Sequence, residues 1–382
     1  MKHSPAVVVG VPLAGRRSRG AAARVNATLG TRGIAAREAI AALTESSLSA
    51  LELLDEVRSR VSRVVPNDSA AWMLTDPQTV MPTSLIRDGL LVPEHIQRCL
   101  EHELFVPDFV PFARLHRAGV VATTLEHATD GRPQLSSSYR EIHEPAGLGP
   151  ELRLLFRTGA ATWAMASVHR AAGEPEFNDD ELAWLRTIAP EAGRALRSAL
   201  ARTPAEPQAA WARGMLVLDD HGAVEYSSGA ADAWLAQIPT TDGFKLPLAV
   251  VSVALQARAQ ALAAGPVYEA PAQARVRLDS GIWLNVHAAA LRDASGASTH
   301  TAVMLEPADR SQLLGLLVEV HGLSEREHQV TQMLLAGLAT DQIAELLSIS
   351  RHTLRDHCKA IFAKLGVASR PELTARFLPD IG

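Results

Sequence analysis

The side chains best suited to recognition chemistry lie near the carboxyl end of the chain, where Arg355 and Lys359 are four residues apart. On a helix this spacing places both charges on one face, and their repulsion costs an isolated helix roughly 0.2–0.5 kcal/mol. An anion bound over the pair would remove that cost. Asp356 lies beside them in the sequence. The chemistry is therefore binding of an anion rather than bond making.

The helix expected over residues 350–365 has the features needed to hold this pair in place. Ser350 can cap its amino terminus by accepting hydrogen bonds from backbone N–H groups. Its apolar side chains repeat at helical spacing and form one buried stripe: Leu354, Cys358, Ile361 and Leu365. Residues 350–376 contain six Lys or Arg and two acidic residues, so this part of the chain carries a net charge of +4. That concentration of positive charge favours a phosphate-bearing partner.

Two more helices are expected directly before this one. Ser324 and Glu327 have the spacing of a capping box, so a helix should begin at the residue after Ser324. Thr340 is a candidate cap for the next helix. The apolar residues of that second helix are Ile343, Leu346 and Leu347. Because only residues 348–349 separate it from the cap at Ser350, the two helices should form a helix-turn-helix.

The LuxR/GerE-type helix-turn-helix family has a pattern that three segments of this chain resemble: Leu323-Ser-Glu-Arg-Glu327, Ile343-Ala-Glu-Leu-Leu-Ser-Ile-Ser350 and Thr353-Leu-Arg-Asp-His-Cys-Lys-Ala-Ile-Phe-Ala-Lys-Leu-Gly366. The resemblance covers residues 323–378 and is dense. It implies an all-α, four-helix DNA-binding domain whose recognition helix enters the major groove of double-stranded DNA. Leu354 stands where the family usually has Val, a harmless change at a core position.

The resemblance also implies which side chains would contact DNA. Base edges would be read by Arg355, Asp356 and Lys359. Backbone phosphates would lie near Ser350, Thr353, His357, Lys364 and Arg370. Asp356 departs from the family, in which an apolar residue is commoner at that position. It could either accept a hydrogen bond from the N4 amine of cytosine or orient Lys359. The helical angle of His357 places it beside the core, which favours a structural hydrogen bond over a base contact.

Length and composition limit the kind of protein that carries this domain. A chain of 382 residues predicts two or three domains. A net charge of −5 suits a small DNA-binding module joined to acidic regulatory domains. Cys99 and Cys358 are far apart in sequence, which favours a reduced, cytoplasmic protein. No apolar run is long enough to cross a membrane, so no membrane partner is expected.

Two α+β sensory domains are expected before the DNA-binding domain. Strands over 152–157 and 162–169, then Phe177-Asn-Asp-Asp-Glu181 and a long helix capped by Asn178, resemble the end of a GAF domain. Strands around Asp219-Asp-His-Gly222 resemble the opening of a PAS domain. The expected organisation is a disordered basic arm at 1–33, a GAF-like domain at 34–202, a linker at 203–212, a PAS-like domain at 213–308, a connecting helix at 309–322 and the LuxR-type domain at 323–382. One helix is expected from residue 34 toward Pro66.

Catalytic and metal chemistry find little support in the sequence. His95, Cys99 and His102 have helical spacing and could share a face with a metal ion, but a second source of ligands is not evident. The glycine-rich phosphate-binding loops and the nucleophile elbow are absent from the sequence. We therefore expect no catalytic residues, no metal site and no cofactor, and a protein that is not an enzyme.

These observations predict a sequence-specific transcription regulator that binds operator DNA as a homodimer. A small-molecule effector or a protein partner would gate it through the upstream domains, and RNA polymerase would be a partner if the protein activates transcription. The alternative is a ligand-binding signalling protein whose C-terminal helices make protein contacts instead of binding DNA.

Overall fold

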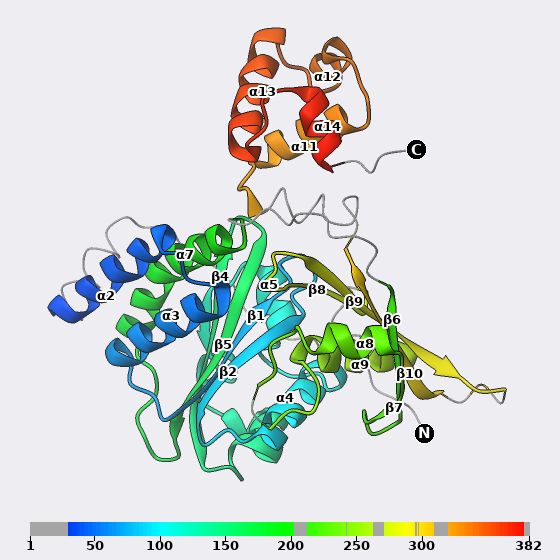
Figure 1. Cartoon of the computed structure of the whole chain (residues 1–382). Coiled ribbons are helices and arrows are strands. Elements are labelled where there is room, and N and C mark those ends of the chain that lie inside the picture. The colour runs from blue at the N-terminus through cyan, green and yellow to red at the C-terminus, as the bar shows by residue number, and fades with distance from the viewer. Residues whose placement is uncertain are drawn as a thin grey trace, which may run out of the picture.

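The computed structural model describes residues 30–201, 212–241, 243–262, 271–294, 296, 298–308 and 320–377. These residues form two antiparallel sheet domains and a small helical domain at the carboxyl end (Figure 1). Nearly all of the basic arm expected at 1–33, the linker at 203–212 and the connecting helix at 309–322 lies outside the described residues. Within the described ranges, no helix is both long enough and apolar enough to span a bilayer.

The first domain is built on a five-stranded sheet in which every neighbouring pair of strands is antiparallel. Its strands are β1 (Ser69–Thr75), β2 (Pro82–Gly89), β3 (Ala122–Thr124), β4 (Leu148–Thr158) and β5 (Ala161–Ala171). They lie in the order β2-β1-β5-β4-β3. The hairpin expected between β4 and β5 is confirmed, and Gly159 adopts a positive φ of 60° in its turn.

Helices cover both faces of this sheet. One face packs against α2 (Gly30–Ala42), α3 (Ala50–Val64) and α7 (Asp179–Ala201). The other face lies under α4 (Pro93–Phe105) and α5 (Phe112–Ala118). The shorter elements are η1 (Leu43–Glu45), α6 (Leu125–Ala128), η2 (Pro133–Leu135) and η3 (Tyr139–His143). Because side chains alternate along a strand, Trp72 packs on the α7 side while Met73 packs on the α4 side.

The amino-terminal part of this domain differs from expectation in three places. Helix α2 begins at Gly30, so residues 30–33 are helical and do not belong to a disordered arm. The helix expected to run from residue 34 to Pro66 is two helices, because Ser49 and Glu52 form a capping box that starts α3. Strand β2 was not expected, since its sequence lacks a clear alternation.

The second domain repeats the strand order of the first. Its strands are β6 (Gly214–Leu218), β7 (Val224–Ser227), β8 (Gln273–Arg277), β9 (Trp283–Arg292) and β10 (Ser298–Pro307). They lie in the order β7-β6-β10-β9-β8. In both sheets, the domain's second strand in sequence is therefore at one edge, and its first, fifth, fourth and third strands follow in that order across the sheet. Two helices accompany this sheet, α8 (Gly229–Leu235) and α9 (Leu248–Ala261). The turn expected at Asp219 is present, and its carboxylate accepts hydrogen bonds from the backbone N–H groups of His221 and Ala223.

The two sheet domains share one apolar core. Helix α9 lies between β2 and β9, and most of its residues are buried because strands of both domains pack against it. Its Ser252 hydroxyl donates to the Pro82 carbonyl across the boundary at 2.7 Å. Arg275 of β8 donates two side-chain hydrogen bonds of 2.8 Å to the Asp76 carboxylate, with both side chains almost fully buried. The two domains therefore pack together tightly. The sequence predicts a linker between them but gives no sign of this packing.

The C-terminal domain contains four described helices, α11 (Glu325–Leu335), α12 (Thr340–Leu346), α13 (Arg351–Leu365) and α14 (Arg370–Phe377). The capping box at Ser324 and the cap at Ser350 are confirmed. The cap of α12 is Ala339, whose N–H donates to Gln342, so Thr340 is the first helical residue and not the cap. Ser348, in the turn before α13, has a positive φ of 51°.

Candidate functional site

Helix α13 separates a buried stripe from an exposed one. Leu354, Ile361 and Leu365 are buried against α11 and α12, and Cys358 is half-buried beside them. Arg355 and Lys359 are exposed on the other side. Within the described part of the chain, neither of these basic side chains makes a hydrogen bond or ion pair to another residue. They are available to an external anion.

Asp356 is also exposed, and its nearest recorded charged partner is not Lys359. Its Oδ2 atom lies 3.7 Å from Nε2 of His352, one turn earlier on the same helix. The Asp356 carboxylate is therefore reachable from solvent, and it makes no contact that would orient Lys359. Its contact with a base stays a prediction.

The hydroxyls at the start of α13 are placed where an anion can approach. Ser350 Oγ accepts a 3.0 Å hydrogen bond from the Thr353 N–H and lies 2.9 Å from Thr353 Oγ1. Both residues are exposed at the amino end of a fifteen-residue helix, the end that carries the positive pole of the helix dipole. His357 is half-buried beside the core, as its helical angle indicated.

Lys364 and Arg370 already have partners inside the domain. Lys364 Nζ donates to Glu327 Oε2 at 2.6 Å and to the Gly322 carbonyl at 3.2 Å. Arg370 Nη2 donates to the Leu334 carbonyl at 2.8 Å, near the end of α11. Burial opposes ionisation of Glu327, but the Lys364 and Ser324 hydrogen bonds hold its pKa below the usual value. The phosphate contacts proposed for these two basic residues remain predictions, and both have structural roles besides.

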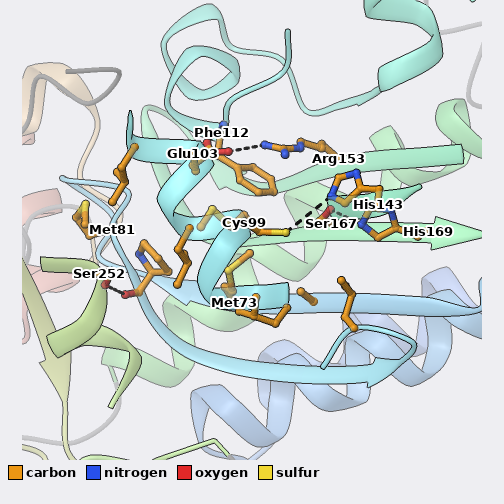
Figure 2. Close-up of a pocket in the computed structure, with 17 residues that line it drawn as sticks. Met73, Met81, Cys99, Glu103, Phe112, His143, Arg153, Ser167, His169 and Ser252 are labelled. Atoms are coloured by element: carbon orange, nitrogen blue, oxygen red, sulfur yellow. Dashed lines mark hydrogen bonds and ion pairs between the residues drawn. The ribbon is translucent and has the colours of Figure 1, made fainter. Parts of the chain in front are cut away.

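A second candidate site is a cavity of about 50 Å³ inside the first domain, between α4 and the sheet (Figure 2). Its apolar lining includes Met73, Met81, Leu91, Ile96, Leu100 and Met165. Its polar lining consists of Cys99, Glu103, His143, Arg153, Ser167, His169 and Ser252. The polar side chains lie mainly at one end of the cavity, toward β4 and β5.

An ion-pair network forms that polar end. Arg153 donates to Glu151 Oε1 at 2.7 Å and to Glu103 Oε2 at 2.6 Å, and it lies 4.6 Å from the centre of the Phe112 ring. Burial opposes ionisation of Glu151, but the Arg153 guanidinium outweighs it and holds the pKa of that carboxyl well below its usual range. Burial raises the pKa of Glu103.

The other titratable groups of the cavity are neutral near pH 7. Burial lowers the pKa of His169 to about 3 and also lowers the pKa of His143. Burial raises the pKa of the Cys99 thiol to about 12. Sequence analysis missed His143, Glu151 and His169, because they lie on separate elements and share no motif. The available signal was the alternating polar pair Ser167 and His169, which interrupts the apolar run at residues 163–168 of the strand.

Two open grooves lie where the sheet domains meet. One of about 840 Å³ separates α4 from the turn at Asp219 and from α9, and includes Lys245 and Arg258. The other, of about 870 Å³, lies between the start of α3 and strand β8. Both volumes fall within the range of small-molecule sites, which occur preferentially at domain interfaces.

Comparisons with known proteins bear on the C-terminal domain. Residues 321–377 match the family model GerE, described as bacterial regulatory proteins of the luxR family. Over 56 residues, 15% of this chain, the sequence is 45% identical to an HTH-type transcriptional regulator in the exeN 3' region of Aeromonas salmonicida. Over a segment of the same length it is 38% identical to the HTH-type transcriptional regulator MalT of Yersinia pestis. The matched segments span 29% and 6% of those relatives.

Solved structures are more distant. The Vibrio cholerae VqmA dimer without target DNA is 18% identical, covers 46% of this chain and 81% of its own, and has a TM-score of 0.20. The E. coli DhaR(N)–DhaL complex is 13% identical, covers 77% and 91%, and has a TM-score of 0.22. Because these TM-scores are low, the arrangement of the upstream domains is inferred from their own geometry alone. Residues 321–377 are a LuxR-type helix-turn-helix domain, the DNA-binding domain of a family of transcription regulators.

Proposed function

We propose that this protein is a sequence-specific transcription regulator that binds double-stranded operator DNA as a homodimer. The observation that carries the proposal is the exposed pair Arg355 and Lys359, which lack partners among the described residues and lie on the helix that a LuxR-type domain places in the major groove. Ser350 and Thr353 at the start of that helix would contact phosphate. Since operator DNA is in the cytoplasm of a bacterium, the protein would work there.

The fold types of the two upstream domains are part of the same proposal. We take the first sheet domain as GAF-like and the second as PAS-like, and their shared strand order supports a common kind of domain. A small-molecule effector would bind in a groove between them, and binding there would alter how the two domains pack. The protein would act without catalysis, and RNA polymerase would be a partner if it activates transcription.

Selection of genomic fragments tests the proposal. The purified full-length chain is incubated with sheared genomic DNA, with and without a cell metabolite extract, and the bound fragments are sequenced. We expect a recurring sequence with two related half-sites, and a change in occupancy when the extract contains the effector. Arg292→Ala is the matched control, because this exposed arginine at the end of β9 lines neither groove and should leave the selection unchanged.

The selection also separates the two candidate functions. Arg355→Ala together with Lys359→Ala should remove the enriched sequence while leaving the circular dichroism spectrum unchanged. If the wild-type protein enriches no sequence under either condition, the proposal of sequence-specific DNA binding is wrong. The C-terminal helices would then be taken as a surface for protein contacts.

A further inference from the structure

Three buried side chains of the first domain converge beside the polar end of the cavity, and two of them, His143 and His169, line it. His143 ends η3, Glu151 lies on β4 and His169 lies on β5. Their exposed fractions are 1%, 0% and 0%. One nitrogen or oxygen atom from each lies within 4.8 Å of such an atom from each of the others. Figure 2 shows His143 and His169 next to each other, with Ser167 beside them.

Each of these three residues has a buried polar atom that forms no hydrogen bond. Among the described residues, His143 Nδ1, Glu151 Oε2 and His169 Nδ1 are buried and form no hydrogen bond. The Nδ1 atom of His143 lies 3.7 Å from Oε2 of Glu151. Buried polar atoms almost always have a partner in folded proteins. Three unsatisfied atoms from converging side chains therefore indicate a group that binds all of them.

The remaining atoms of the three side chains are already held. His169 Nε2 lies 2.9 Å from Ser167 Oγ, and that hydroxyl donates to Glu151 Oε1 at 2.9 Å. Arg153 Nε donates to the same Glu151 oxygen. His143 Nε2 lies 3.8 Å from the Cys99 sulfur. Metal-binding histidines and carboxylates are oriented in this way, with one atom held by a protein neighbour and the other left for the ion.

We propose that His143, Glu151 and His169 bind a divalent transition-metal ion such as Zn²⁺ or Fe²⁺. Two imidazole nitrogens and one carboxylate oxygen are the donor set that these ions take in open sites. Ligand atoms at about 2.05 Å around a tetrahedral ion lie about 3.3 Å apart, so the three donors must approach one another by at most about 1.5 Å. The adjoining cavity of about 50 Å³ has room for a water molecule at a further coordination position.

This site differs from the helical set considered in the sequence. Cys99 of α4 directs its sulfur toward His143, and His102 lies 3.4 Å from Glu141. The converging donors come instead from η3, β4 and β5. The proposed ion does not depend on DNA binding, so it extends the proposed function and can be tested without an operator.

Metal content of the full-length protein is the direct test. The protein is stripped with a chelator, incubated with Zn²⁺ or, separately, Co²⁺, and dialysed before elemental analysis. We expect about one equivalent per chain, with visible Co²⁺ bands and without a thiolate-to-cobalt charge-transfer band, because Cys99 is outside the donor set. His143→Gln and His169→Gln should each weaken Zn²⁺ binding at least tenfold. His116→Gln is the matched control, since this histidine bonds to Thr162 elsewhere on β5.

Thermal unfolding gives a second test, in which each variant is compared with itself, with and without Zn²⁺, so that a less stable variant can still be judged. Zn²⁺ should raise the melting temperature of the wild type and of His116→Gln, because an ion that binds only the folded state stabilises it. It should not raise that of the two ligand variants. The proposal is overturned if the wild type keeps only background metal. It is also overturned if bound Co²⁺ shows a charge-transfer band that is lost in Cys99→Ala, because the ion would then be held from α4.

Discussion

Arg275 and Arg355 carry the same charge in opposite surroundings. Arg275 is buried between the two sheet domains and is held by the Asp76 carboxylate. Arg355 is exposed on α13, without a protein partner among the described residues. A buried charge must be paired within the fold, so removing its partner destabilises the folded state. An exposed basic pair contributes little to stability and leaves its charge for a ligand. Arg275 thus holds the two sheet domains together, whereas Arg355 leaves an exposed charge on the helical domain for the binding that we propose.

The largest test of this contrast is Arg275→Met. Removing one member of a buried pair leaves Asp76 charged and without its partner, so we expect the free energy of unfolding to fall by about 3–5 kcal/mol. Urea denaturation measures this loss. Arg351→Met is the matched control, because its ion pair with Asp341 is 73% and 62% exposed and should be worth less than about 1 kcal/mol. Equal losses in the two variants would contradict the contrast.

Lys359→Ala is expected to weaken DNA binding without changing the stability of the fold. Loss of a base-reading side chain should weaken specific operator binding by about 1–3 kcal/mol and leave the free energy of unfolding unchanged within about 0.5 kcal/mol. Fluorescence anisotropy with the selected operator and a scrambled duplex measures the first quantity. Unchanged operator affinity would show that α13 is docked differently. Arg370→Ala should instead weaken all duplexes equally and lower the salt slope by about one if Arg370 also contacts phosphate.

The buried histidine should make the first domain sensitive to acid. The folded state keeps His169 neutral down to its pKa of about 3, whereas the unfolded chain takes up a proton below about pH 6.5. The free energy of unfolding should therefore fall by about 1 kcal/mol as the pH decreases from about 6.5 to 5.5. The low pKa of Glu151 acts in the same direction but at lower pH, since its stabilisation is lost only as the pH falls below the unfolded pKa of about 4.5. Urea titrations of metal-free protein across this range should show a smaller decrease for His169→Gln.

The smallest expected effect lies in the turn of the helix-turn-helix. Ser348 adopts a left-handed backbone conformation that glycine adopts without steric cost. Ser348→Gly should therefore stabilise the C-terminal domain by about 0.5–1 kcal/mol, measured as a higher urea midpoint. Ser348→Val should destabilise it, because a β-branched residue tolerates that conformation poorly. Operator affinity should be unchanged in Ser348→Gly, since this residue is outside the proposed contact set.

The sequence alone determined the helical domain in most of its detail. Its helices begin at local signals, such as the Ser324 capping box and the cap at Ser350, and each signal acts within one turn of chain. The buried stripe of α13 follows from helical spacing in the same way. Local rules also located the hairpin of β4 and β5 and the turn at Asp219. They fail at Ser49, because the apolar spacing continues on both sides of its capping box and predicts one continuous helix there.

Only the tertiary structure decided which distant residues meet. Asp76 and Arg275 are 199 residues apart, and no local pattern pairs them. The convergence of His143, Glu151 and His169 depends on the register of β4 against β5, in which Glu151 lies opposite His169. Lys364 and Arg370 likewise found partners on or just before α11 that their own helices did not indicate. Helix caps and periodicity are short-range properties, whereas strand register and domain packing are settled by the whole core at once.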